Sequence, residues 1–202
     1  MKNIFITNIP MMGDRLKKGI YESADDYGID TNVETAFPII PVIKAKQEDG
    51  VETKVIALRF DNPNSRTNME MFFDELESVG VSRDQVVDIA VEENQKDVTG
   101  INIFLSALKE IDDHSDVYAC VTYSTNIMSM MSMYLLDSLE YLKDNVKVQG
   151  VYYGEVQRLD DQEQRRLFYD ITNLVFLNHA IKEISDLKLS DPEKMLEKLL
   201  EK

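Results

Sequence analysis

The sequence has 202 residues, of which 44% are hydrophobic and 29% charged, the proportions of an ordinary globular protein. Its net charge of −15 argues against broad binding to duplex nucleic acid, which needs a basic surface. The single cysteine excludes an internal disulfide, and the two histidines lie too far from it in sequence for metal-ligand spacing. No apolar run is long enough to span a membrane, so we expect a cytoplasmic protein with no metal and no membrane contact.

Apolar runs and turn residues predict the elements of the first half of the chain. They are a strand over 2–9, a short helix around 14–26, strands over 35–45 and 53–60, and a helix over 65–80. Pro10 ends the first strand, and Asp49-Gly50 is a turn signal that joins the next two strands as a hairpin.

The second half alternates strongly between strands and helices. The predicted strands cover 85–91, 116–124 and 146–156, and the predicted helices cover 97–111, 126–145, most of 166–187 after a short strand or turn, and 191–202. Such alternation with short connections predicts an α/β fold, a Rossmann-like, mostly parallel sheet with helices on both faces. Ligands of such sheets bind beyond the carboxyl ends of the strands, at a topological switch point.

Three polar turns fit that location: residues 7–10, 92–99 and 122–126. The last of these reads TYSTN and offers hydroxyl groups, an amide and the start of a helix. Helix capping explains part of this pattern, because such side chains satisfy free N–H groups of a first helical turn. Binding is the other interpretation, because the same N–H groups can hold phosphate even in an acidic protein, and Tyr123 could stack on a base.

The methionine-rich helix that follows is interpreted mainly as core. A stripe at helical spacing is expected to be buried, comprising Ile127, Met130, Met131, Tyr134, Leu135, Leu139 and Leu142. Met128 and Met133 lie off this stripe and are candidates for contact with a partner subunit. Asp97 is a further candidate for ligand binding, although a helix-capping carboxylate looks the same. No set of nucleophile, base and orienting group is visible, so catalytic residues stay unknown.

Several strings together resemble the CRISPR-associated Rossmann-fold (CARF) sensor family. They are KNIFITNIP near the start, VYACVTYSTN before the long apolar helix, VQGVYYGEV after it, and LFYDITNLVFLNHAI further on. The resemblance covers residues 2–188, and the order and spacing of the strings are its most specific feature.

The resemblance implies a homodimer that binds one cyclic oligoadenylate, with four or six adenylates, across its two Rossmann-like sheets, and no cofactor. That ligand is the second messenger of type III CRISPR systems in antiviral defence. The implied ligand-binding residues are those of the two turns: Thr7, Asn8, Ile9, Pro10, Thr122, Tyr123, Ser124, Thr125 and Asn126.

Two departures bear on catalysis. Where the family often has Gly and a basic residue, this chain has Ser124 and Asn126. A ring nuclease that cleaves the messenger is the alternative function, and the missing cation predicts slow cleavage or none. A nucleotide-dependent enzyme of another family is disfavoured, because the first strand is followed by TNIPMMG instead of G-x-G-x-x-G.

Family members usually carry an effector domain that the sensor activates allosterically. We expect residues 1–188 to be the sensor domain and 189–202 to be an amphipathic helix. This helix would connect to an effector in a longer chain or stabilise a dimer.

Overall fold

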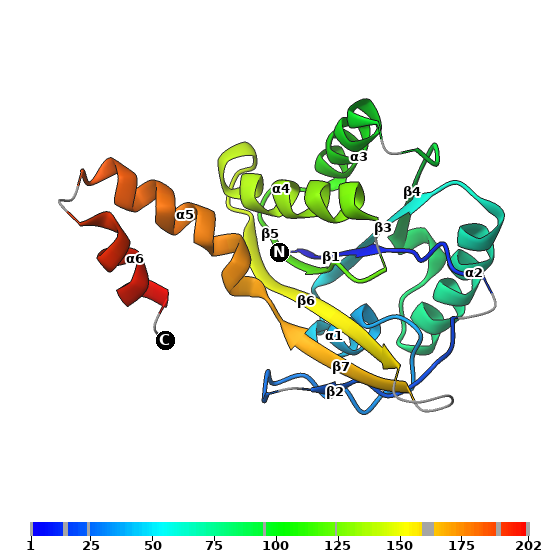
Figure 1. The fold of residues 1–202 in the computed structure, drawn as a ribbon. Helices are drawn as coiled ribbons and strands as arrows, with labels where there is room; N and C mark the ends of the chain where they lie inside the picture. Colours follow the sequence, from blue (N-terminus) through cyan, green and yellow to red (C-terminus); the bar gives the residue numbers. More distant parts are fainter. Residues whose placement is uncertain are drawn as a thin grey trace.

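One seven-stranded sheet forms the centre of the molecule, with strand order β2-β7-β6-β5-β1-β3-β4 (Figure 1). This computed structural model describes residues 2–13, 16–23, 25–94, 96–123, 125–158, 164–188 and 191–200. The strands are β1 (Lys2–Asn8), β2 (Glu22–Ser23), β3 (Glu52–Phe60), β4 (Val86–Val91), β5 (Ser115–Cys120), β6 (Lys147–Arg158) and β7 (Gln164–Asp170). The helices are α1 (Ile39–Lys46), α2 (Pro63–Ser78), α3 (Asp97–Glu110), α4 (Asn126–Leu142), α5 (Thr172–Asp186) and α6 (Pro192–Leu200).

The sheet is mostly parallel, which confirms the predicted Rossmann-like α/β fold. Strand β1 lies in the middle and pairs in parallel with β3 on one side and β5 on the other. Only the pair of β6 and β7 is antiparallel among the named strand pairs of the described residues. Because the chain leaves β1 toward β3 and later returns to β5, the topological switch point lies between β1 and β5.

Both faces of the sheet are covered, so its central strands are buried on both sides. Side chains of β1 alternate between two hydrophobic clusters, as the two-residue period of a strand requires. Phe5 belongs to the cluster that contains residues of α1 and α2, whereas Ile4 and Ile6 belong to the cluster beneath α3 and α4. None of the helices in the described part of the chain is long and apolar enough to cross a membrane.

Two predictions for the first half of the chain are wrong. The segment around 14–26 has no helix in its described part and instead contains the short strand β2; residues 14, 15 and 24 lie outside the described residues. The expected strand over 35–45 is the helix α1, whose Pro41 lies in the first turn, where a missing N–H costs nothing. The turn at Gly50, with φ of +81°, therefore joins a helix to β3 and not two strands of a hairpin.

The expected buried stripe of α4 is wrong in part: Leu135 and Leu139 are buried as expected, but so is Met128, which was expected to lie off the stripe. The buried side chains are Met128, Ser132, Leu135, Leu136 and Leu139, whereas Met130, Tyr134 and Leu142 are more than half exposed. Apolar residues occur on every side of this helix, so spacing alone did not identify the buried one. Ser132 can lie in the core because its hydroxyl donates a hydrogen bond of 3.0 Å to the Met128 carbonyl.

Replacing Met128 with alanine should lower the free energy of unfolding by about 2–5 kcal/mol, because it leaves a cavity under α4. The control, Leu142→Ala, should change it by no more than about 0.5 kcal/mol, since that side chain is 53% exposed. Urea unfolding of both variants measures the difference. Equal losses would contradict the observed orientation of α4.

Candidate functional site

Two of the turns singled out in the sequence meet at the switch point. Thr7 of β1 faces Cys120 of β5 in the parallel register, so residues 8–10 lie beside the turn that begins at Val121. This is the carboxyl edge of the sheet, where the fold predicts a ligand. The sequence therefore identified a pair of neighbouring turns, although they are more than 100 residues apart in the chain.

The loop after β1 is held in place by α2. Asn68, itself buried, donates hydrogen bonds to the Pro10 carbonyl at 2.8 Å and to the Met12 carbonyl at 2.7 Å. Thr7, Ile9 and Pro10 are buried, so what they contribute is chiefly a fixed backbone path. Sequence reasoning missed Asn68, because its position in a helix gave no sign of a role in the loop.

Thr122 anchors the second turn to β6. Its Oγ1 accepts a hydrogen bond of 2.7 Å from the buried N–H of Gly154 and lies 3.2 Å from the Cys120 sulfur. Gly154 must be glycine here, because a Cβ at this position would come within 2.4 Å of the Pro38 side chain. The hydroxyl of Thr122 is thus engaged in hydrogen bonds within the protein.

Tyr123 anchors the same turn to the segment before α1. Its hydroxyl donates to the Ala36 carbonyl at 2.9 Å and shares a hydrogen bond of 2.8 Å with the hydroxyl of Tyr21. Burial raises the pKa of both tyrosines, so both stay protonated and able to donate. The φ of Tyr123 is 63°, which is rare for a bulky residue and is held by these contacts. Stacking on a base would require Tyr123 to leave them.

At the start of α4, in contrast, a polar side chain has no hydrogen-bond partner. Thr125 is the residue before the helix, yet its side chain makes no capping hydrogen bond, and its Oγ1 is buried without a partner. The Thr125 side chain therefore accepts no hydrogen bond from the first-turn N–H groups of α4. Asn126 is exposed, and Ser124 lies outside the described residues.

Asn8 provides a second buried polar atom without a partner. The residue is 2% exposed, and its Oδ1 has no hydrogen bond. By the alternation along β1, Asn8 lies on the same face as Ile4 and Ile6, which is the face covered by α3 and α4. Buried polar atoms are nearly always satisfied in proteins, so unpaired atoms in both neighbouring turns indicate a place for a polar ligand.

Asp97 lies at the other side of this helix layer. It begins α3, is exposed, and accepts a hydrogen bond of 2.8 Å from the N–H of Val98. Strand β4, which precedes α3, is two strands away from β1. One turn later Gly100 packs against α4, since a Cβ there would lie 3.1 Å from Ile127. The structure thus places Asp97 in the first turn of α3, where its carboxylate accepts from a backbone N–H, and not in the pair of turns.

Two arginines near the carboxyl edge, Arg59 and Arg66, are already paired with carboxylates. Arg59, close to the end of β3, is buried and contacts Asp88 through two hydrogen bonds of 2.8 Å and Asp61 at 3.0 Å. Hydrogen bonds from Arg66 and then Arg59 hold the pKa of Asp61 well below its usual range. Among the described residues, no cluster of three or more metal-binding side chains occurs. Neither Arg59 nor Arg66 is thus free to bind an anion, whereas the pair of turns offers N–H groups, hydroxyls and amides.

Comparison with known proteins gives one partial similarity. The chain is 26% identical over 77 residues, 38% of its length, to the CRISPR-associated protein MJ1674 of Methanocaldococcus jannaschii. The match spans only 12% of that larger protein. No family model matches the chain.

The two threonines of the turn should respond differently to removal of the hydroxyl. Thr122→Val should lower the free energy of unfolding by about 1–3 kcal/mol, because the buried N–H of Gly154 loses its acceptor. Thr125→Val should change it by no more than about 0.5 kcal/mol, since its Oγ1 has no partner to lose. Thermal and urea unfolding in the absence of ligand measure both. A large loss for Thr125→Val would show that its hydroxyl is already used.

Proposed function

We propose that the chain is a sensor domain that binds a cyclic oligoadenylate of four or six units across a homodimer and activates an effector in type III CRISPR defence. The similarity to a CRISPR-associated protein supports the link to CRISPR. The resemblance of the motifs to the CARF family, together with the Rossmann-like sheet, supports the class of ligand. In this proposal residues 1–188 bind the ligand, and 189–202 lead to an effector or stabilise the dimer.

One observation carries the proposal: at the switch point, the start of α4 lies beside two unpaired polar side chains, Asn8 and Thr125. The first-turn N–H groups and the Thr125 hydroxyl can donate to a phosphate at the positive end of the helix dipole. The Asn8 amide can accept from a ribose hydroxyl or an adenine amine. These are the repeating groups of an oligoadenylate, and neither a cation nor a metal is required to bind them.

Because this turn is anchored, we favour the ligand-binding interpretation over the helix-capping one. Thr122 and Tyr123 hold the backbone from two sides before the helix begins. The site is thereby formed before the ligand arrives, which lowers the entropic cost of binding.

The charge pattern supports the homodimer. A chain with a net charge of −15 repels its own copies, yet residues 98–108 and 117–136 contain no charged side chain. These segments supply much of α3 and the first part of α4, where Val98, Ile101 and Leu105 form an exposed apolar stripe. Two copies that meet on this face bring their α4 starts into one assembly while their acidic surfaces stay apart.

Ligand binding would act on an equilibrium between open and closed arrangements of the two copies. The shift can be no larger than the preference of the ring for the closed arrangement. Cleavage of the ring would need charge stabilisation that Asn126 does not supply, so we expect the ring to stay intact.

Calorimetric titration tests the proposal. Cyclic tri-, tetra- and hexa-adenylate are titrated into the chain, with linear tetra-adenylate and NAD as controls. We expect one ring size to bind with one ring per two chains, and chromatography of the mixture to recover the ring uncut. Rapid appearance of linear products would favour the ring nuclease instead, and no binding by any ring to the folded chain would refute the sensor.

Substitutions at the unpaired groups should weaken that binding without unfolding the chain. Thr125→Val and Asn8→Ala should each raise the dissociation constant by about tenfold, the equivalent of about 1.4 kcal/mol for one lost hydrogen bond. Thr67→Val, the same chemical change at an exposed position of α2, is the control and should leave the constant unchanged. Wild-type affinity in both site variants would place the ligand elsewhere.

The apolar stripe of α3 gives a separate test of the homodimer. Ile101→Glu adds a negative charge at a position that is 53% exposed, and it should shift the chain toward monomer in light scattering. Ile20→Glu, at a position that is 51% exposed outside this stripe, is the control and should not. A dimer that withstands Ile101→Glu and dissociates with Ile20→Glu would require a different interface.

A further inference from the structure

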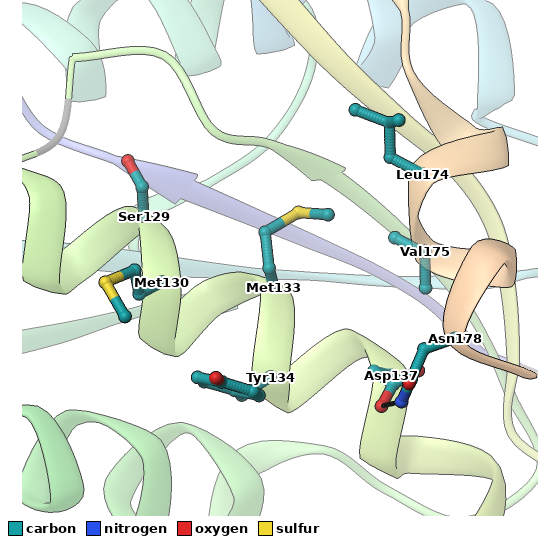
Figure 2. Close-up of a pocket in the computed structure, with 8 residues that line it drawn as sticks. All are labelled: Ser129, Met130, Met133, Tyr134, Asp137, Leu174, Val175 and Asn178. Carbon is teal, nitrogen blue, oxygen red and sulfur yellow. Dashed lines mark hydrogen bonds between the residues drawn. The ribbon is translucent and has the colours of Figure 1, made fainter. Parts of the chain in front are cut away.

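A groove runs between α4 and α5 (Figure 2). Its volume is about 380 Å³, and it is lined by Ser129, Met130, Met133, Tyr134, Asp137, Leu174, Val175 and Asn178. Met133 of α4 extends toward Leu174 and Val175 of α5, and these apolar side chains form walls of the groove. Its polar end holds Asp137, which accepts a hydrogen bond of 2.8 Å from Asn178. The groove thus suits an apolar group that is bordered by a positive charge.

Helices α5 and α6 form an arm that extends from the body of the molecule (Figure 1). Leu196 of α6 faces α5, where it lines a shallow cavity with Ile181 and Ile184. Met195 and Leu199, one turn apart, remain 38% and 43% exposed. Helix α6 therefore uses one part of its apolar side against α5 and leaves the adjoining part uncovered.

The charges of α6 are divided between the two borders of its apolar side. At 100° per residue, Lys194 and Lys198 lie next to the uncovered edge formed by Met195 and Leu199. Glu193 and Glu197 lie beyond the edge that faces α5. The uncovered edge is thus apolar with a basic border, in a chain that is acidic overall.

The border of the groove carries the opposite charge. Asp137 and Glu140 lie one turn apart on α4 and both contact the imidazole of His179, at 3.2 and 3.4 Å. Among the described residues, neither carboxylate pairs with a lysine or an arginine. Groove and helix edge therefore complement each other in polarity and in charge.

We propose that α6 of a second copy of this chain occupies the groove between α4 and α5. Met195 and Leu199 of the second copy enter the apolar part, while its Lys194 and Lys198 approach Asp137 and Glu140. Each copy offers one groove and one helix, so the exchange is reciprocal and closes a two-fold dimer without free ends. The inference rests on the homodimer of the proposed function and gives its carboxyl-terminal helix a docking place.

Cross-linking between two variants tests the exchange without any ligand. Met130→Cys places a thiol in the groove, and Leu199→Cys places one on α6; the native Cys120 is 1% exposed and does not react. One variant is labelled with ¹⁵N, the two are mixed and allowed to exchange subunits, and a short bismaleimide is added. Mass spectrometry then identifies linked peptides that pair a labelled with an unlabelled chain.

We expect a mixed link between positions 130 and 199, and we expect it to be lost when Asp74→Cys, exposed on α2, replaces Met130→Cys. Links only between two copies of the same variant, or a dimer in light scattering without the mixed link, would overturn the exchange and leave the ligand proposal standing. Conversely, a mixed link in a chain that binds no ring would support the exchange and refute the sensor.

Discussion

The candidate site depends on one buried hydrogen bond, from the N–H of Gly154 in β6 to Oγ1 of Thr122 at the end of β5. It fixes the point at which the chain leaves the sheet. The next residue, Tyr123, adopts a positive φ and is held by Ala36 and Tyr21 on the opposite face. These two residues together determine where α4 begins, and so where its first-turn N–H groups lie. The first residues of the turn thus anchor the backbone, and in the proposed function Thr125 and Asn126 bind the ligand.

The helices of the two halves of the chain differ in how much apolar surface they expose. Helices α1 and α2 carry no large exposed hydrophobic residue among their described side chains, whereas α3, α4, α5 and α6 all do. The helices of the second half therefore present most of the exposed apolar surface, whereas the proposed ligand groups come from both halves, Asn8 from the first and Thr125 from the second. A ligand at the start of α4 and a partner in the groove along α4 would act on the same helix, which is a direct route for coupling.

The sequence was sufficient for the parallel sheet, for most elements and for the meeting of the two turns, because these follow from alternating patterns and from topology. It was insufficient where one residue pattern was compatible with more than one structure. The apolar run with Pro38 and Pro41 suited an edge strand as well as α1, whose first turn tolerates proline. Apolar residues surround α4, and its buried face includes the polar Ser132, so this face could not be found from the spacing of apolar residues. The partners of Thr122 and Tyr123, namely Gly154 and Tyr21, lie far away in sequence, and only the fold brings them together.

Amide hydrogen exchange of the chain, alone and with cyclic tetra-adenylate or cyclic hexa-adenylate, tests the central claim most directly. If the start of α4 binds the ring through its free N–H groups, one ring should slow exchange at residues 126–128 and in the loop after β1. The amides of α1 and α2, on the opposite face, should exchange at unchanged rates. Protection elsewhere with none at the start of α4, or no protection by either ring, would contradict the account.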